Sequence, residues 1–111
     1  MTAGAQPMGT VLVAGLGVSG AAAARTLLAR GEEVLLTDAA EPAVVAELVD
    51  AGARWLGPLT ALPEDVDLVV TSPGWRPDHP LLVAAMNHGL EVIGEPELAW
   101  RLRIPGPDGG P

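Results

Sequence analysis

Short apolar runs alternate with helical patterns along this chain, and glycine or proline marks most of the boundaries between them. Continuous apolar runs are typical of strands buried on both faces, whereas apolar residues spaced three and four apart are typical of helices packed on one face. The predicted strands are Thr10–Ala14, Val34–Thr37, Ala53–Leu56, Val66–Thr71 and Glu91–Ile93. The predicted helices are Val18–Arg30, Pro42–Asp50, Pro80–Asn87 and Pro96–Leu102.

This alternation predicts an α/β fold, a Rossmann-like three-layer sandwich with five parallel strands in the order 3-2-1-4-5. We expect the first and fourth strands to form the central pair, because both are apolar on both faces. Two helices carry apolar stripes that we expect to face the sheet. Their residues are Val44, Val45, Leu48 and Val49 in one helix, and Leu81, Leu82, Ala85 and Met86 in the other.

The chain has 111 residues, enough for one domain with a single core. We assign residues 10–103 to this domain. Residues 1–9 are expected to be a flexible N-terminus. Residues 104–111, IPGPDGGP, have no periodic pattern and are expected to be a linker.

A glycine-rich motif, GLGVSG, lies directly after the first predicted strand and at the start of the first predicted helix. Gly15 permits the tight turn, Gly17 lets the backbone approach a pyrophosphate, and Gly20 allows the helix to pack closely on the strand. The amides of Val18 and Ser19 then point at an anion from the positive end of the helix. The motif in this context predicts a diphosphate site, although the glycines alone could serve only a compact turn.

Two further segments are expected beside the glycine loop. Asp38 ends the second strand, some twenty residues beyond the loop, where an acid often accepts a hydrogen bond from a ribose hydroxyl. Taken alone, this spacing favours NAD, although an aspartate is also common as a simple cap at such a position. Ser72, Pro73 and Gly74 follow the fourth strand and are expected to form the opposite wall of the crevice.

The charge balance narrows the possible functions. Fourteen acids against six bases give a net charge of −8, the wrong sign for binding a nucleic acid backbone. All six bases are arginine and cysteine is absent, so the chain supplies no P-loop lysine, Schiff base or thiol nucleophile. His79 and His88 are nine residues apart and do not suit a shared metal site. We therefore predict a binding domain without catalytic or metal-ligating residues, outside the membrane and in the cytoplasm.

The ordered set of motifs resembles the N-terminal domain of the Mur ligases, over Thr10–Arg103. The resemblance rests on VLVAGLGVSGAAAARTLLARGEEV, then LLTD, TSPGWRPDHPLL and GLEVIGEPELAWR. The combination of TSPG, HP and GEPEL is similar to this family as a whole. The GLGVSG loop is more similar to the D-glutamate-adding branch than to the L-alanine-adding branch.

This resemblance implies a three-domain, ATP-dependent enzyme of peptidoglycan precursor synthesis. Its N-terminal domain would hold UDP-N-acetylmuramoyl-L-alanine, a central ATPase domain would use ATP and Mg²⁺, and a C-terminal domain would bind D-glutamate. This chain would need no cofactor of its own. Val18 and Ser19 match the family's diphosphate-contacting loop, Asp38 matches the acid beside the uracil, and residues 72–74 match the other wall.

One departure from the family pattern concerns the residues after this acid. They are Ala39 and Ala40, whereas the family often has polar or basic residues there. The uridine contacts are therefore expected to be fewer or displaced. An alternative remains open, an NAD(P)-binding domain of an oxidoreductase or regulatory protein, for which the glycine loop and Asp38 would suffice.

Overall fold

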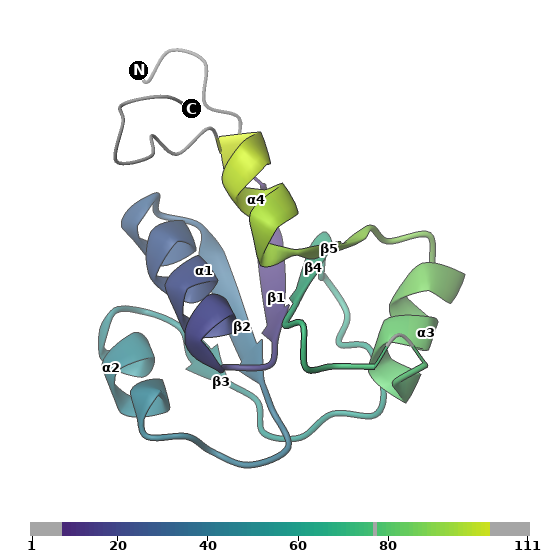
Figure 1. Ribbon diagram of the computed structural model, residues 1–111, viewed down its shortest axis with the longest axis horizontal. Helices are drawn as coiled ribbons and strands as arrows, with labels where there is room; N and C mark the ends of the chain where they lie inside the picture. Colours follow the sequence, from purple (N-terminus) through teal and green to yellow (C-terminus); the bar gives the residue numbers. More distant parts are fainter. Residues whose placement is uncertain (1–7, 77, 103–111) are drawn as a thin grey trace.

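The computed structural model describes residues 8–76 and 78–102 (Figure 1). The strands are β1 Thr10–Ala14, β2 Glu33–Thr37, β3 Arg54–Trp55, β4 Leu68–Thr71 and β5 Val92–Gly94. The helices are α1 Val18–Ala29, α2 Val44–Asp50, α3 Pro80–Asn87 and α4 Glu95–Leu102. All four strand pairs are parallel and the sheet order is β3-β2-β1-β4-β5, which confirms the predicted α/β architecture.

The central strands are aligned so that their carboxyl ends meet in one row. Ala14, the last residue of β1, pairs with Thr37 at the end of β2 and with Thr71 at the end of β4. The loops that follow these three strands therefore leave the sheet side by side. This alignment places the segments that the sequence singled out along one edge.

The two faces of the sheet bury separate hydrophobic clusters. One face packs Val11 and Val13 against α1, α2 and α4, with Leu27, Leu48 and Leu98 fully or almost fully buried. The other face packs Leu12, Ala14 and Val69 against α3 and against leucines of the segment between β3 and β4. These are the three layers expected from the sequence, with the helices on the two sides of the sheet as Figure 1 shows.

Several details differ from the prediction. Helix α2 begins at Val44 rather than Pro42, and β4 begins at Leu68 rather than Val66. Two residues expected to face the sheet are exposed, Val49 by 43% and Met86 by 52%. Each follows an inward residue by one position. That inward residue, Leu48 or Ala85, is the last buried residue of its helix, so a further rotation of about 100° carries the next side chain toward solvent.

The predicted N-terminal segment and linker lie mostly outside the described residues, which exclude 1–7 and 103–111. Met8 belongs to the predicted N-terminal segment, and its backbone N–H donates a hydrogen bond to the Oε1 atom of Glu32 at 3.0 Å. Across the described part of the chain, no helix has the length and apolar character that crossing a membrane requires.

Candidate functional site

The glycine loop, residues 15–20, connects β1 to α1 at the carboxyl edge of the sheet. Gly15 has a φ of +94°, a backbone conformation that favours glycine, and its N–H donates to the carbonyl of Thr37 at 2.9 Å. A Cβ on Gly15 would lie 2.6 Å from the Cβ of Ser72. The first glycine therefore allows the loops after β1 and β4 to approach closely.

Gly20 lies in the first turn of α1 and is buried. A Cβ at this position would overlap the carbonyl oxygen of Gly15 and would contact Val13 at 3.7 Å. The absence of a side chain therefore allows the helix to begin directly against the loop. This is the packing role expected of the third glycine.

The N-terminus of α1 is open to solvent. Gly17 is the N-cap residue in an extended conformation, and its own chain neighbours aside, no described atom lies within 4 Å of where its Cβ would be. Within the described chain, no side chain caps this helix and its first turn contains no acid. Val18 is 91% exposed. The N–H groups of the first turn lack intrahelical acceptors, so they are available to an anion.

Asp38 joins the end of β2 to the glycine loop. Its Oδ2 atom accepts a hydrogen bond from the backbone N–H of Leu16 at 2.8 Å, and its Oδ1 atom accepts from the N–H of Ala39 at 2.7 Å. Sequence reasoning assigned this carboxylate to a nucleoside and missed its contact with the loop. The predicted neighbourhood of the first two strands was the available signal, because it places the end of the second strand beside the loop.

The segment after β4 forms a tight turn on the other side of the loop. The N–H of Ser72 donates to the carbonyl of Ala14 at 2.9 Å, which continues the pairing of the sheet. The Oγ atom of Ser72 accepts a hydrogen bond from the N–H of Gly74 at 3.3 Å. The backbone carbonyl of Ser72 accepts one from the N–H of Trp75 at 3.0 Å. Pro73 and Gly74 are left exposed at the tip.

The structure thus places all nine residues predicted for the site along one edge of the sheet. They are Gly15, Gly17, Val18, Ser19, Gly20, Asp38, Ser72, Pro73 and Gly74. The contacts of Asp38 with Leu16 and of Gly15 with Ser72 bring the three segments together. Their role in binding stays a prediction. Leu16 and Trp75 also belong to this edge, although neither was predicted as a site residue.

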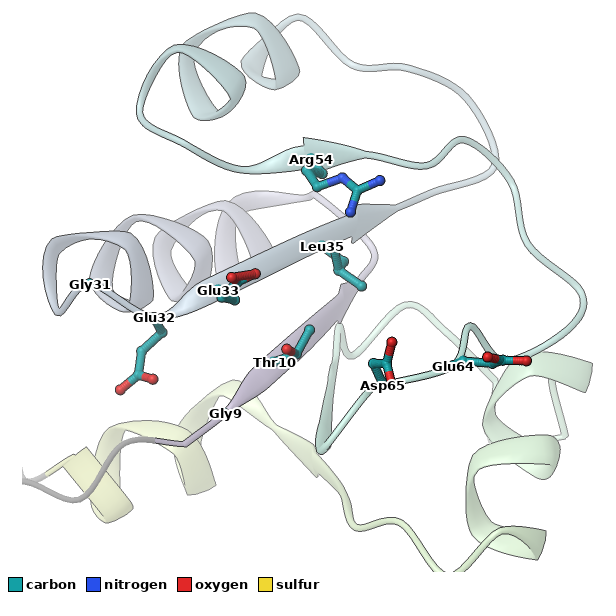
Figure 2. A pocket seen from close by; sticks show the side chains of 9 residues that line it. All are labelled: Gly9, Thr10, Gly31, Glu32, Glu33, Leu35, Arg54, Glu64 and Asp65. Carbon is teal, nitrogen blue, oxygen red and sulfur yellow. The ribbon is translucent and has the colours of Figure 1, made fainter.

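A hollow of about 470 Å³ adjoins these loops, lined by Ala39 and by residues 74–76 and 78–80. A second hollow of about the same volume lies at the opposite edge, where Thr10 and Glu33 begin β1 and β2 (Figure 2). Its lining includes four carboxylates and one guanidinium, from Glu32, Glu33, Glu64, Asp65 and Arg54. This mostly negative lining is unsuited to a diphosphate.

Comparison with known proteins places this architecture in a family. Residues 9–94 match the model of the family described as Mur ligase MurD-like, N-terminal domain. A UDP-N-acetylmuramoylalanine--D-glutamate ligase of Thermobifida fusca is 54% identical over 101 residues, covering 86% of this chain and 22% of that protein. The ligase of the same name from Streptomyces avermitilis is 48% identical over 101 residues, again covering 86% and 22%.

Solved structures of Mur ligases share the fold at low sequence identity. UDP-N-acetylmuramate-alanine ligase MurC from Thermotoga maritima matches with a TM-score of 0.74 at 21% identity, over 85% of this chain and 22% of that protein. The chain thus spans about a fifth of the length of the relatives quoted above. Because the family match covers most of the sequence, the chain belongs to the MurD-like N-terminal domains of the Mur ligases.

Proposed function

We propose that this chain binds the uridine diphosphate end of UDP-N-acetylmuramoyl-L-alanine at the carboxyl edge of its sheet. The observation that carries this proposal is the uncapped, acid-free N-terminus of α1. It opens beside β4, where the order of the strands reverses and ligands of such folds bind. The names of the relatives support the choice of this nucleotide, because they are UDP-N-acetylmuramoylalanine--D-glutamate ligases.

Each segment of the site has a role in this proposal. The amides of Val18 and Ser19 donate hydrogen bonds to the diphosphate, and Gly17 leaves the room that the phosphates occupy. Asp38 holds the loop and lies toward the nucleoside end. Residues 72–74 close the site from the other side.

In the full-length protein, residues 10–103 act as the substrate-binding domain of the ATP-dependent ligase that adds D-glutamate in peptidoglycan precursor synthesis in the cytoplasm. Residues 104–111 lead to the central ATPase domain, and a C-terminal domain follows it. We assign ATP and Mg²⁺ to the central domain, because this chain contains no lysine for a P-loop. Its described part also holds no cluster of three His, Cys, Asp or Glu residues that could bind a metal ion. The chain alone is therefore expected to lack ligase activity.

A second candidate function is binding of a nicotinamide dinucleotide, and Asp38 near the end of β2 favours NAD. Calorimetric titration of the 111-residue chain with UDP, UDP-N-acetylmuramoyl-L-alanine, pyrophosphate, NADH and NADPH separates the two. We expect both uridine nucleotides to bind with dissociation constants of roughly 0.1–1 mM, because atoms that reach the other domains find no partners here. Preferential binding of NADH or NADPH, with no response to UDP, would establish the second function instead.

The variant Gly17→Val tests where the diphosphate binds. The added side chain enters open space, so the fold is expected to persist, but it occupies the volume assigned to the phosphates. We expect UDP affinity to fall at least roughly tenfold, close to 1.4 kcal/mol. Ala29→Val, at the exposed far end of α1, is the matched control and should bind as the wild type does. Unchanged affinity in folded Gly17→Val would contradict the site assignment.

A further inference from the structure

The hollow beside the glycine loop lies between the ends of β2 and β4. Ala39, directly after Asp38, lines one side, and residues 74–76 and 78–80 line the other. The hollow therefore begins where two segments of the proposed diphosphate site end. Its volume of about 470 Å³ leaves room for a flat ring next to that site.

Two aromatic rings stand together in the wall of this hollow. The ring centroids of Trp75 and His79 are 4.2 Å apart, with an angle of 35° between the ring planes. The indole of Trp75 also lies against the glycine loop, because its Nε1 atom is 2.6 Å from where a Cβ on Gly15 would be. The aromatic wall and the proposed phosphate-binding loop are therefore in direct contact.

Hydrogen bonds position the two residues that carry these rings. The N–H of Trp75 donates to the carbonyl of Ser72 at 3.0 Å and completes the turn after β4. His79 is the N-cap of α3, and its Nδ1 atom accepts from the N–H of Leu81 at 3.1 Å. The imidazole is therefore fixed at the start of α3, and the indole lies between this imidazole and the glycine loop.

The two charged side chains that line this hollow belong to one ion pair. The exposed guanidinium of Arg76 pairs with the carboxylate of Asp78 at 3.3 Å. Across from the rings, the residue after Asp38 is Ala39, whose side chain is a methyl group. Recognition here therefore depends on apolar and aromatic contact.

We propose that Trp75 and His79 form the wall against which the heterocyclic base of the nucleotide packs. This inference rests on the proposed function and extends it to residues that favour a ligand with a base over a bare diphosphate. An aromatic face attracts any base by stacking, and the adjacent loop fixes the phosphates, so the two contacts together select a nucleoside diphosphate over a bare diphosphate. The wall takes the place of the polar contacts that Ala39 and Ala40 lack.

The test compares UDP with inorganic pyrophosphate on three tryptophan variants of the 111-residue chain, by calorimetry. In Trp75→Leu we expect UDP affinity to fall about tenfold and pyrophosphate affinity to stay within roughly twofold. Trp75→Phe should recover most of the UDP affinity. Trp100→Leu is the matched control, because Trp100 is 67% exposed on α4, and it should behave as the wild type. Quenching of tryptophan fluorescence by UDP should disappear only in the Trp75 variants.

A second variant guards against damage to the fold. His79→Asn keeps an N-cap side chain for α3 while removing the ring, and we expect a smaller loss of UDP affinity, about threefold. Equal losses for UDP and pyrophosphate in Trp75→Leu would overturn the inference, since Trp75 would then only support the loop. Unchanged UDP affinity in both Trp75→Leu and His79→Asn would overturn it too. If the wild type binds pyrophosphate but not UDP, the proposed function fails together with this inference.

Discussion

Two hollows of about the same volume lie at opposite edges of one sheet, and their linings differ in charge and in aromatic content. The hollow at the carboxyl edge lies between the segments after β2 and β4, which contact the glycine loop, and its lining contains two aromatic rings. The hollow at the amino edge is lined by four carboxylates and Arg54. Volume alone would not distinguish the two as binding sites.

The direction of the helices explains the difference. In a parallel α/β sheet each helix begins at the carboxyl edge and ends at the amino edge, so the two edges receive opposite ends of the helix dipole. Glu32 and Glu33 add negative charge just beyond the C-terminal end of α1. At the start of α4, Glu95 and Glu97 already occupy the first turn, whereas the first turn of α1 has no acid. Of these two helix starts, only that of α1 is left for an external anion.

Replacing one glycine at each edge should give the largest contrast. Gly20→Ala places a Cβ against the carbonyl oxygen of Gly15, which is backbone and cannot rotate away. We expect a loss of about 3 kcal/mol in the free energy of unfolding, by urea denaturation. Gly31→Ala at the amino edge meets no described atom within 4 Å and strains only the positive φ, for a loss of about 1 kcal/mol. Equal losses would show that the close helix start is not what constrains Gly20.

Two aspartates allow an intermediate test, because each accepts a hydrogen bond from a backbone N–H at one edge. Asp38 accepts from Leu16, which is buried, and Asp67 accepts from Thr10 at 2.8 Å in a more exposed position. We expect Asp38→Ala to lower the free energy of unfolding by about 1–2 kcal/mol, and Asp67→Ala by about 0.5–1 kcal/mol. Thermal denaturation of both variants measures this order.

The same pair sharpens the contrast in binding. Asp38→Ala should weaken UDP more than pyrophosphate, because we assign the carboxylate to the nucleoside end of the proposed site. Its bond to Leu16 adds a smaller loss for pyrophosphate as well, because the loop loses an anchor. Asp67→Ala should leave both affinities unchanged. A loss of UDP affinity in Asp67→Ala would mean that the two edges are not independent.

The smallest expected effect concerns an ion pair at the amino edge. A hydrogen bond from Arg101 lowers the pKa of Glu91, which precedes β5, below its ordinary value of 4.5. A lowered carboxylate pKa contributes stability that is present above the unfolded pKa and is lost as the pH falls through the folded pKa. As the pH is lowered from about 5 to about 3, the melting temperature of Glu91→Gln should therefore fall less than that of the wild type. Glu64→Gln, whose carboxylate forms no ion pair within the described chain, should follow the wild-type profile.

Much of the fold follows from sequence pattern, because strands buried on both faces require continuous apolar runs. Thr10–Ala14 and Pro80–Asn87 have the predicted bounds, and the strand order follows from the same alternation. Short amphipathic helices are harder to orient. Val49 and Met86 extend an apolar stripe in the sequence, yet helices of seven and eight residues cover too little of the sheet to bury them.

The candidate site was predictable at the level of segments and less so at the level of side chains. The glycine motif predicts where the backbone needs a positive φ or close packing. Gly15 has the positive φ, and Gly20 has the close packing contact. The bond from Leu16 to Asp38 and the pairing of Trp75 with His79 depend on side-chain direction across loops. Residue spacing along the chain does not encode such directions.

The shared row of Ala14, Thr37 and Thr71 ties the assembly of the candidate site to the folding kinetics of the sheet. Leu16 and Asp38 are 22 residues apart in sequence, and Thr10 and Asp67, which join β1 to the segment before β4, are 57 apart. Closing loops of this length loses chain entropy before any contact compensates for it, so such parallel pairings form slowly and together. A partly folded chain in which β4 has not yet joined β1 would have the glycine loop without its opposite wall. Ligand binding should therefore appear in a refolding experiment only with the final cooperative phase.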